Sequence, residues 1–182
     1  MPAKKISIPL LFGLIAALCS ILFACGAWLA GPVAFIGPTV WLDRCLAILI
    51  AAIAAALEKR VRGGALDFRS ALKISYGILV LAIAAQSLME WLIPSVIDPH
   101  FYQQIVPVLI AKTEKSYLQF GAADDQLRAA VNDIRANNQF SLGRVISGTG
   151  YLLVLFFIIA VLIAVTVKSK TGPTPKPESQ NT

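Results

Sequence analysis

Long apolar runs separated by short polar segments dominate this chain of 182 residues. No charged residue occurs between Lys5 and Asp43, and Gly31-Pro32 and Gly37-Pro38 interrupt this stretch with residues that break helices. Because a helix needs about 20 apolar residues to cross the hydrocarbon core of a bilayer, the stretch holds one complete span and the beginning of a second. Two further apolar runs follow. The pattern predicts four transmembrane helices, at about residues 8–30, 39–57, 72–97 and 145–167.

The segment between the third and fourth apolar runs, residues 98–144, mixes charges of both signs with amides. Leu127, Val131 and Ile134 recur there at spacings of four and three, which is typical of one face of an amphipathic helix. A shorter helix is expected at residues 101–105, interrupted near Pro107. We therefore predict an all-α integral membrane protein: one four-helix membrane domain over residues 1–168, with a small extracytoplasmic helical insert between helices 3 and 4. Residues 169–182, rich in proline, serine and threonine, are expected to form a disordered cytoplasmic tail.

The composition supports the same class. Hydrophobic residues make up 57% of the chain and charged residues 14%, against about 45–50% and about 25% in soluble domains. The three cysteines have no metal-like spacing, a single histidine cannot build a multi-histidine metal site, and the sequence contains no glycine-rich phosphate loop or nucleophile motif. We therefore expect no enzymatic activity, no cofactor, no metal and, despite the net charge of +6, no nucleic-acid partner.

The distribution of cations predicts the orientation. If both termini and the segment between the second and third spans are cytoplasmic, ten of the 16 lysines and arginines lie on that side, as the positive-inside rule requires. Trp28, Trp41 and Trp91 then fall near the outer ends of their helices, as in the aromatic belts of membrane proteins. We predict a multi-pass protein with both termini in the cytoplasm.

The densest positive charge lies in the sequence EKRVRGGALDFRSALK, residues 58–73, between the second and third spans. Gly63-Gly64 is expected to form the turn of a cytoplasmic hairpin, and Leu66, Phe68 and Leu72 are expected along the inner membrane interface. The cations either set the orientation alone or also bind anionic lipid headgroups, which contribute about 1 kcal/mol per cation near a membrane surface. The candidate lipid contacts are Lys59, Arg60, Arg62, Arg69 and Lys73.

Ionisable residues also fall within the predicted spans, where they are costly and tend to find partners. Counted from the inner ends of their helices, Arg44 and Glu90 lie at similar heights, about 21–25 Å above the inner surface. We predict that Arg44 contacts Glu90 or Asp43 near the outer interface, with Gln86 facing the bundle interior. The alternative is that the charged side chains simply extend to water.

Two patterns in the first two spans have more than one interpretation. Ile21-Leu22-Phe23-Ala24-Cys25 resembles a bacterial lipoprotein cleavage box, which would place a lipid on Cys25. The residues that follow remain apolar, and we interpret the segment as an ordinary transmembrane helix. Small residues also recur every four positions, which lets helices approach closely within the chain or in a homo-oligomer. These are Gly13 and Ala17; Ala16, Ser20 and Ala24; and Ala47, Ala51 and Ala55.

Three segments carry a family resemblance when they are taken in order. They are GGALDFRSALKISYGILV around the start of the third span, WLIPSVIDPHFYQQI at its end, and GAADDQLRAAVNDI in the insert, followed by an apolar helix that ends in lysines. Over roughly residues 6 to 170 the chain resembles the bacterial family called domain of unknown function 4199. The resemblance implies a small four-helix protein of the bacterial inner membrane, and it brings no reaction or ligand to transfer to this chain.

These observations favour a non-enzymatic inner-membrane protein that serves as a scaffold or accessory component of a membrane assembly. Its partners would be the lipid bilayer with anionic headgroups at the cytoplasmic face, other membrane proteins, or further copies of the chain. A small transporter or channel that acts as an oligomer is the alternative, with Arg44, Gln86 and Glu90 along its pathway. A lipid-modifying enzyme is the least supported, because the spans offer no evident acid–base pair.

Overall fold

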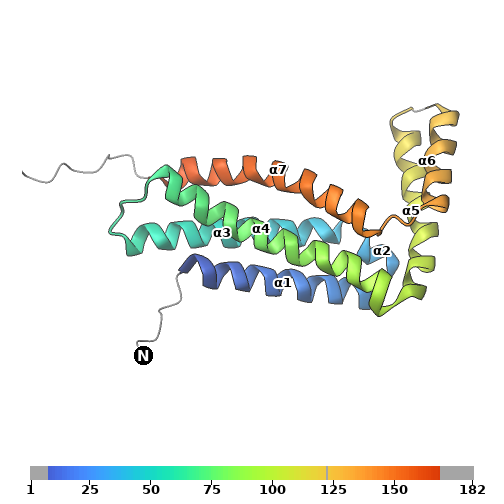
Figure 1. The fold of residues 1–182 in the computed structure, drawn as a ribbon. Helices are drawn as coiled ribbons and strands as arrows, with labels where there is room; N and C mark the ends of the chain where they lie inside the picture. The colour runs from blue at the N-terminus through green and yellow to red at the C-terminus, as the bar shows by residue number, and fades with distance from the viewer. Residues whose placement is uncertain (1–7, 122, 169–182) are drawn as a thin grey trace, which may run out of the picture.

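The computed structural model describes residues 8–121 and 123–168, and every regular element within them is a helix. Four helical segments are long and apolar enough to cross a membrane, and they form an elongated bundle with the other helices at one end (Figure 1). The predicted all-α membrane fold is confirmed; the expected tail, residues 169–182, lies outside the described residues. In chain order the elements are α1 (Ile8–Ala30), α2 (Pro32–Phe35), α3 (Thr39–Val61), α4 (Phe68–Leu92), a π-helical turn η1 (Ile93–Ile97), α5 (Pro99–Gln119), α6 (Asp124–Ala136) and α7 (Leu142–Val167).

The hairpin loop, residues 62–67, reverses the chain between α3 and α4 and marks what we call the hairpin end of the bundle. Gly63 and Gly64 have φ angles of 68° and 87°, a left-handed conformation that suits glycine after a helix. Both helices extend about one turn beyond the apolar runs that predict them, because hydropathy marks the lipid boundary whereas caps decide where a helix ends. Here the Asp67 side chain accepts a hydrogen bond from the Ser70 amide at 3.0 Å and so caps α4.

The prediction that Leu66 lies along the membrane interface is wrong. Leu66 is only 1% exposed and belongs to the main core cluster, together with Ala55 of α3 and Ala71 of α4. Because alanine side chains are short, a leucine from the loop can complete the packing between the two helix ends. Phe68, which begins α4, is 36% exposed by contrast.

The central helix of the bundle is α4, which packs against α1, α3 and α7. It approaches α1 closely: a Cβ atom added at Gly13 would lie 2.6 Å from Leu81 Cδ1. Small residues on α1 and α3 are buried within the bundle, so this pattern serves helix packing inside one chain. The buried small residues are Gly13, Ala16, Ser20 and Ala24 of α1, and Ala47, Ala51, Ala54 and Ala55 of α3.

Pro107 does not interrupt the first helix of the insert, contrary to the prediction. α5 continues through it as one helix from Pro99 to Gln119. A proline inside a helix removes one amide donor and leaves the carbonyl four residues earlier without its helical partner. Both Pro107 and Gln103 are exposed, so water can reach this part of the helix and replace the lost hydrogen bond.

The cap, which we define as α5 and α6, lies across the end of the bundle opposite the hairpin loop (Figure 1). A second apolar cluster joins the cap to the bundle through the short α2. Phe35 of α2 meets Phe101 of α5 edge to face, with 5.3 Å between ring centroids, and Ile93 and Ile105 are completely buried in the same cluster. The cap is therefore a packed part of the fold.

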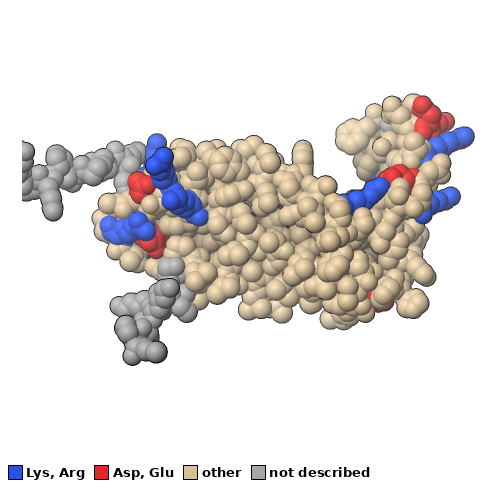
Figure 2. All heavy atoms as spheres, in the orientation of Figure 1, with Lys and Arg blue, Asp and Glu red and all other residues tan. Residues whose placement is uncertain are grey.

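Charged side chains gather at the two ends of the molecule (Figure 2). In that view the surface between the ends is uncharged over most of the length of the bundle. Such a belt matches the hydrocarbon core of a bilayer, where exposed charges are costly. The four apolar helices and this belt together identify a multi-pass membrane protein.

An ion pair ties α6 to the first turn of α7. Arg144 Nη1 and Nη2 donate to Asp133 Oδ2 and Oδ1 at 3.0 and 2.9 Å, a two-point contact that fixes both side chains. Asn137 and Gln139 donate to the same carboxylate. These hydrogen bonds, with that from Arg144 the largest contribution, lower the pKa of Asp133 to about 2.

We expect this tether to weaken in acid. The pKa of Asp133 is about 2 in the folded protein against an ordinary value of 3.8. Its stabilising contribution is therefore complete above about pH 4 and is lost as the pH falls through about 2. Arg144→Gln should raise this pKa toward 3.8, as measured from the carboxyl ¹³C chemical shift of Asp133 by NMR. Asn137→Ala should raise it by less, and an unchanged pKa in R144Q would contradict the assignment.

Candidate functional site

Each of the four membrane helices contributes a polar side chain near one level of the bundle. Asp43 of α3, Gln86 of α4 and Thr149 of α7 each lie eighteen residues, about 27 Å, from the end of their helix at the hairpin end. Ser20 of α1 joins them through a hydrogen bond to Asp43. The polar layer, as we name this group, consists of Ser20, Asp43, Arg44, Gln86, Ser87, Glu90 and Thr149.

Asp43 is held between α1 and α3. It is only 3% exposed, and the hydroxyl of the fully buried Ser20 lies 3.0 and 3.2 Å from its two carboxylate oxygens. Because a hydroxyl has one proton, Ser20 donates to one oxygen at a time, and the carboxylate keeps capacity for a further donor or a cation. Ser20 reaches Asp43 because it belongs to the buried small-residue face of α1.

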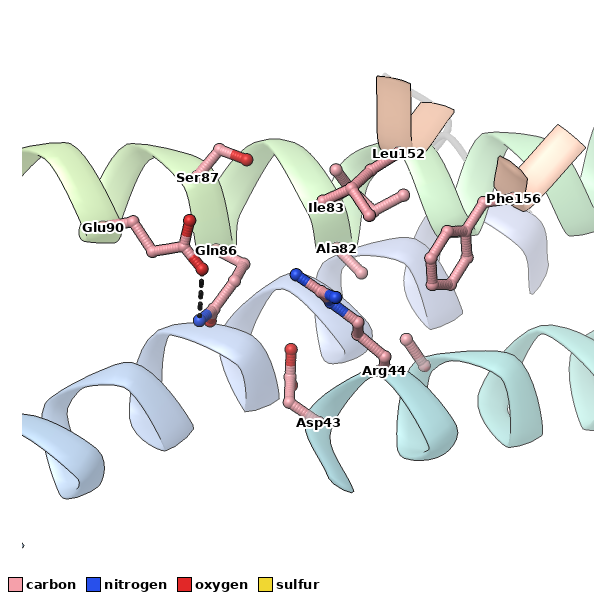
Figure 3. Close-up of a pocket in the computed structure, with 10 residues that line it drawn as sticks. Asp43, Arg44, Ala82, Ile83, Gln86, Ser87, Glu90, Leu152 and Phe156 are labelled. Carbon is pink, nitrogen blue, oxygen red and sulfur yellow. Dashed lines mark hydrogen bonds between the residues drawn. The ribbon is translucent and has the colours of Figure 1, made fainter. Parts of the chain in front are cut away.

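Gln86 and Glu90 lie one turn apart on α4. Gln86 Nε2 donates to Glu90 Oε1 at 3.3 Å, as the dashed line in Figure 3 marks. Gln86 is 8% exposed and faces the bundle interior, as expected from the sequence. Its other amide atom, Oε1, is buried and accepts no hydrogen bond from the described residues. This atom is an unused acceptor inside the membrane-spanning part of the protein.

Arg44 takes a different partner from the one predicted. Within residues 8–121 and 123–168 it forms no ion pair within 4.0 Å, so the expected contact with Glu90 or Asp43 is not made. Its guanidinium instead lies over the ring of Trp41, 4.8 Å from the centroid. Trp41 precedes Arg44 by three residues on the same helix, so this contact needs no particular packing between helices. Arg44 still lines the same cavity as the two acids.

A cavity of about 10 Å³ lies among Asp43, Arg44, Gln86 and Glu90 (Figure 3). Ser87 and apolar side chains from α3, α4 and α7 form the rest of its wall. That volume is close to the minimum that one water molecule requires. The cavity can therefore hold a water molecule or a small ion, and it is too small for an organic substrate. The structure thus brings all four predicted polar residues around one small space.

Three members of the polar layer are not predicted from the sequence: Ser20, Ser87 and Thr149. The hydroxyls of Ser87 and Thr149 are hydrogen-bonded across α4 and α7 at 2.7 Å. A lone serine or threonine in an apolar helix usually bonds to a carbonyl of its own helix, so its presence alone carries little information. For Ser20 the sequence does give an indication that the side chain faces the bundle, because Ser20 belongs to the series of small residues Ala16, Ser20 and Ala24.

The five candidate lipid contacts all lie near the hairpin end, where Figure 2 shows a group of cations. Arg62 pairs with Glu58 at 2.9 Å, and Lys59 Nζ lies 3.5 Å from the carbonyl oxygen of Lys168. The remaining three, Arg60, Arg69 and Lys73, are exposed. The last three are therefore the best placed to contact another charged group.

Among the described residues, no three His, Cys, Asp or Glu side chains stand close enough together to hold one metal ion. Cys19, Cys25 and Cys45 are free thiols. Cys25 lies within α1, which continues without a break from Ile8 to Ala30.

A comparison with protein families gives one match. The family described as protein of unknown function (DUF4199) matches residues 11–169, which include the polar layer, the cap and all of the membrane helices except the first three residues of α1. No curated protein and no solved structure matches the chain.

We expect Ser20→Ala to destabilise the bundle because it leaves a buried carboxyl group without its hydrogen-bond donor. The free energy of unfolding should fall by about 1–2 kcal/mol, measured by SDS titration in mixed micelles. Ser75→Ala is the matched control: Ser75 is also completely buried, but it donates to the Ala71 carbonyl of its own helix. Equal losses in the two variants would show that the contact between Ser20 and Asp43 adds nothing.

Proposed function

The chain belongs to the DUF4199 family, and we propose that this membrane protein is a non-enzymatic scaffold or accessory component of a membrane assembly. In this role the protein binds other membrane helices through its lipid-facing surface. Its partners are other membrane proteins or further copies of the chain, and the proposal includes no nucleic acid.

The observation that carries the proposal is the direction of the small residues on α7. In α1 and α3 such residues point into the bundle, whereas Gly143, Ser147 and Gly150 of α7 are exposed at spacings of four and three. A Cβ atom added at either glycine would meet no described atom within 4 Å beyond its own helix. Helices associate in lipid mainly by close packing, for which exposed small residues are suited.

A groove beside these residues adds to the same surface. It has a volume of about 410 Å³, runs between α4 and α7, and is bordered by Ala84 and Leu88 of α4 and by Gly150 of α7. Its wall is almost entirely apolar, with Ser87 and Thr149 already bonded to one another. A second helix that packs against α7 would find both a close approach and a recess for its larger side chains.

The apolar core between the polar layer and the hairpin end supports a structural role over transport through one copy. Ile78, Leu79 and Phe156 are at most 1% exposed there, and alanines close the remaining space. In the described part of this region the one buried hydroxyl is that of Ser75, which donates to the Ala71 carbonyl of its own helix. Such a core supplies no continuous series of polar groups for an ion or solute.

A small transporter or channel that acts as an oligomer is the second candidate. The observation in its favour is the polar layer itself, to which every membrane helix contributes. A pathway between copies would need polar groups on the outer surface of the bundle nearer the hairpin end. The exposed side chains of α7 in that half are apolar, such as Phe157, Ile158 and Leu162, up to Thr166 in its last turn.

We further propose that the protein lies in the inner membrane of a bacterium, with both termini in the cytoplasm and the cap outside. The cations at the hairpin end support this orientation through the positive-inside rule. The exposed side chains of Arg60, Arg69 and Lys73 also suit contacts with anionic headgroups on the cytoplasmic face.

The assembly role predicts that filling the small-residue face of α7 releases the partner. Gly150→Leu should reduce the amount of partner chain that remains with the protein after extraction in mild detergent, by about tenfold if it costs about 1.4 kcal/mol of association. The readout is quantitative mass spectrometry of the purified complex, which also reports a second copy of the chain.

The matched control is Gly77→Leu. Gly77 is also an exposed glycine in a membrane helix, and a Cβ atom there likewise meets nothing within 4 Å. Equal partner recovery in G150L and G77L would contradict the proposed interface. A protein that purifies only as a partner-free monomer would contradict the assembly role itself.

The lipid contacts have their own test. Replacing Arg60, Arg69 and Lys73 together by glutamine should lower the retention of phosphatidylglycerol by about fivefold per cation, equivalent to about 1 kcal/mol each. Native mass spectrometry of the detergent-extracted protein measures the retained phosphatidylglycerol. Cysteine labelling measures the membrane orientation of the same variant. The control replaces Lys112, Lys115 and Arg128 of the cap. If the first variant changes orientation but keeps its lipid, the cations set topology alone.

A further inference from the structure

The cavity in the polar layer carries an unbalanced charge. Two acidic side chains line it, Asp43 from α3 and Glu90 from α4, and a single basic one, Arg44. With all three ionised, their sum is one negative charge. Asp43 is 3% exposed and Glu90 is half-buried, so water cannot fully solvate this charge. Unneutralised charge within a membrane-spanning bundle is costly and tends to attract a partner.

The remaining helices do not neutralise this charge. On α1, the side chain that contacts Asp43 is Ser20, whose hydroxyl carries no charge. The wall formed by α7 consists of Leu152 and Phe156. The lining therefore contains no other acidic or basic side chain among the described residues.

A second observation indicates that the missing group is positive or donates a proton. Gln86 lines the cavity, and its buried Oε1 accepts no hydrogen bond from the described residues, whereas Nε2 of the same amide donates to Glu90. Buried polar atoms in native proteins almost always have a partner. An acceptor that is left free beside two carboxylates favours a cation or a protonated group over an anion.

The size of the cavity limits the choice further. A space of about 10 Å³ admits one species of the size of a water molecule. Proton and Na⁺ both meet this limit, the proton on a carboxylate oxygen or carried by a water molecule. Choline and other organic cations are too large.

We propose that the polar layer binds a single monovalent cation, H⁺ or Na⁺, between the carboxylates of Asp43 and Glu90 and the amide oxygen of Gln86. Binding brings the charge of the cluster to zero while Arg44 remains ionised on Trp41. The bound cation completes the contacts between α3 and α4 and so stabilises the bundle. This site does not depend on the assembly role, because it lies inside one copy of the chain.

Thermal unfolding of the full chain in lipid nanodiscs provides the test, followed by tryptophan fluorescence. The unfolding midpoint is measured in NaCl and in choline chloride at equal ionic strength, across a series of pH values. A rise in the midpoint with Na⁺ at constant pH identifies Na⁺ as the ligand. A rise as the pH falls, equal in both salts, identifies the proton. In either case the ligand stabilises the folded state by mass action.

Charge-changing variants show whether the effect arises in the polar layer. Asp43→Asn and Glu90→Gln each bring the cluster to zero charge without a ligand, so the effect of the cation should disappear in both. Arg44→Gln leaves two negative charges, so half of the effect should occur at a cation concentration at least about tenfold lower. Asp133→Asn, which removes an acid from the cap, is the control; above about pH 4, where Asp133 is ionised in the wild type, it should keep the wild-type dependence on Na⁺ and on pH.

The predicted effects are opposite: D43N and E90Q should abolish the dependence on the cation, whereas R44Q should strengthen it. The proposal therefore remains testable even if one variant does not fold. A wild-type midpoint that responds to neither Na⁺ nor pH would overturn it. So would a response that persists unchanged in E90Q, or one that weakens in R44Q. If D43N does not fold, the contrast between E90Q and R44Q still decides.

Discussion

Hydrocarbon offers no hydrogen-bond partner to a polar group, and the whole structure follows from this constraint. The backbone satisfies it by forming helices through the entire membrane-spanning part. Polar side chains satisfy it in pairs: Ser20 with Asp43, Gln86 with Glu90, and Ser87 with Thr149. Among the described residues, one buried side-chain atom has no hydrogen-bond partner, Gln86 Oε1, and Gln86 lines the cavity where the charge is unbalanced. The exception and the candidate binding site therefore coincide.

The same constraint explains why small residues matter more than large ones for the architecture. Apolar side chains gain little from leaving lipid for a protein core, so helices associate by close packing and by polar contacts. On α1 and α3 the small residues permit the approach that brings Ser20 to Asp43. On α7 the corresponding residues face outward, which leaves a surface ready for another helix. The same pattern of small residues therefore supports packing within the chain on α1 and α3, and packing against another chain on α7. The difference between them is whether the small residues face the bundle or the lipid.

Much of the fold could be predicted because the relevant information is local. Each span depends on the length of its own apolar run, and the reversal between α3 and α4 depends on Gly63 and Gly64. The errors arise where a residue depends on distant neighbours. The hydrophobicity of Leu66 alone predicts a place at the interface, but the residue is buried because short alanines on two helices leave space for it. The residue type of Pro107 predicts a helix break, but Pro107 lies on an exposed face of α5 where the lost hydrogen bond is tolerated.

The candidate site divides in the same way. Counting residues along each helix places Asp43, Arg44, Gln86 and Glu90 at similar depths, because the rise per residue of a helix is constant. Equal depth in the membrane does not decide which of these side chains form hydrogen bonds or ion pairs with one another. Whether Asp43 meets Arg44 or Ser20 depends on the rotation of α3 and on α1 being its neighbour. Apolar length and charge along the chain are thus sufficient for the number of spans and for the presence of intramembrane polar groups. Side-by-side packing of helices distant in sequence decides which groups pair, which acceptor is left over, and which small residues face the lipid.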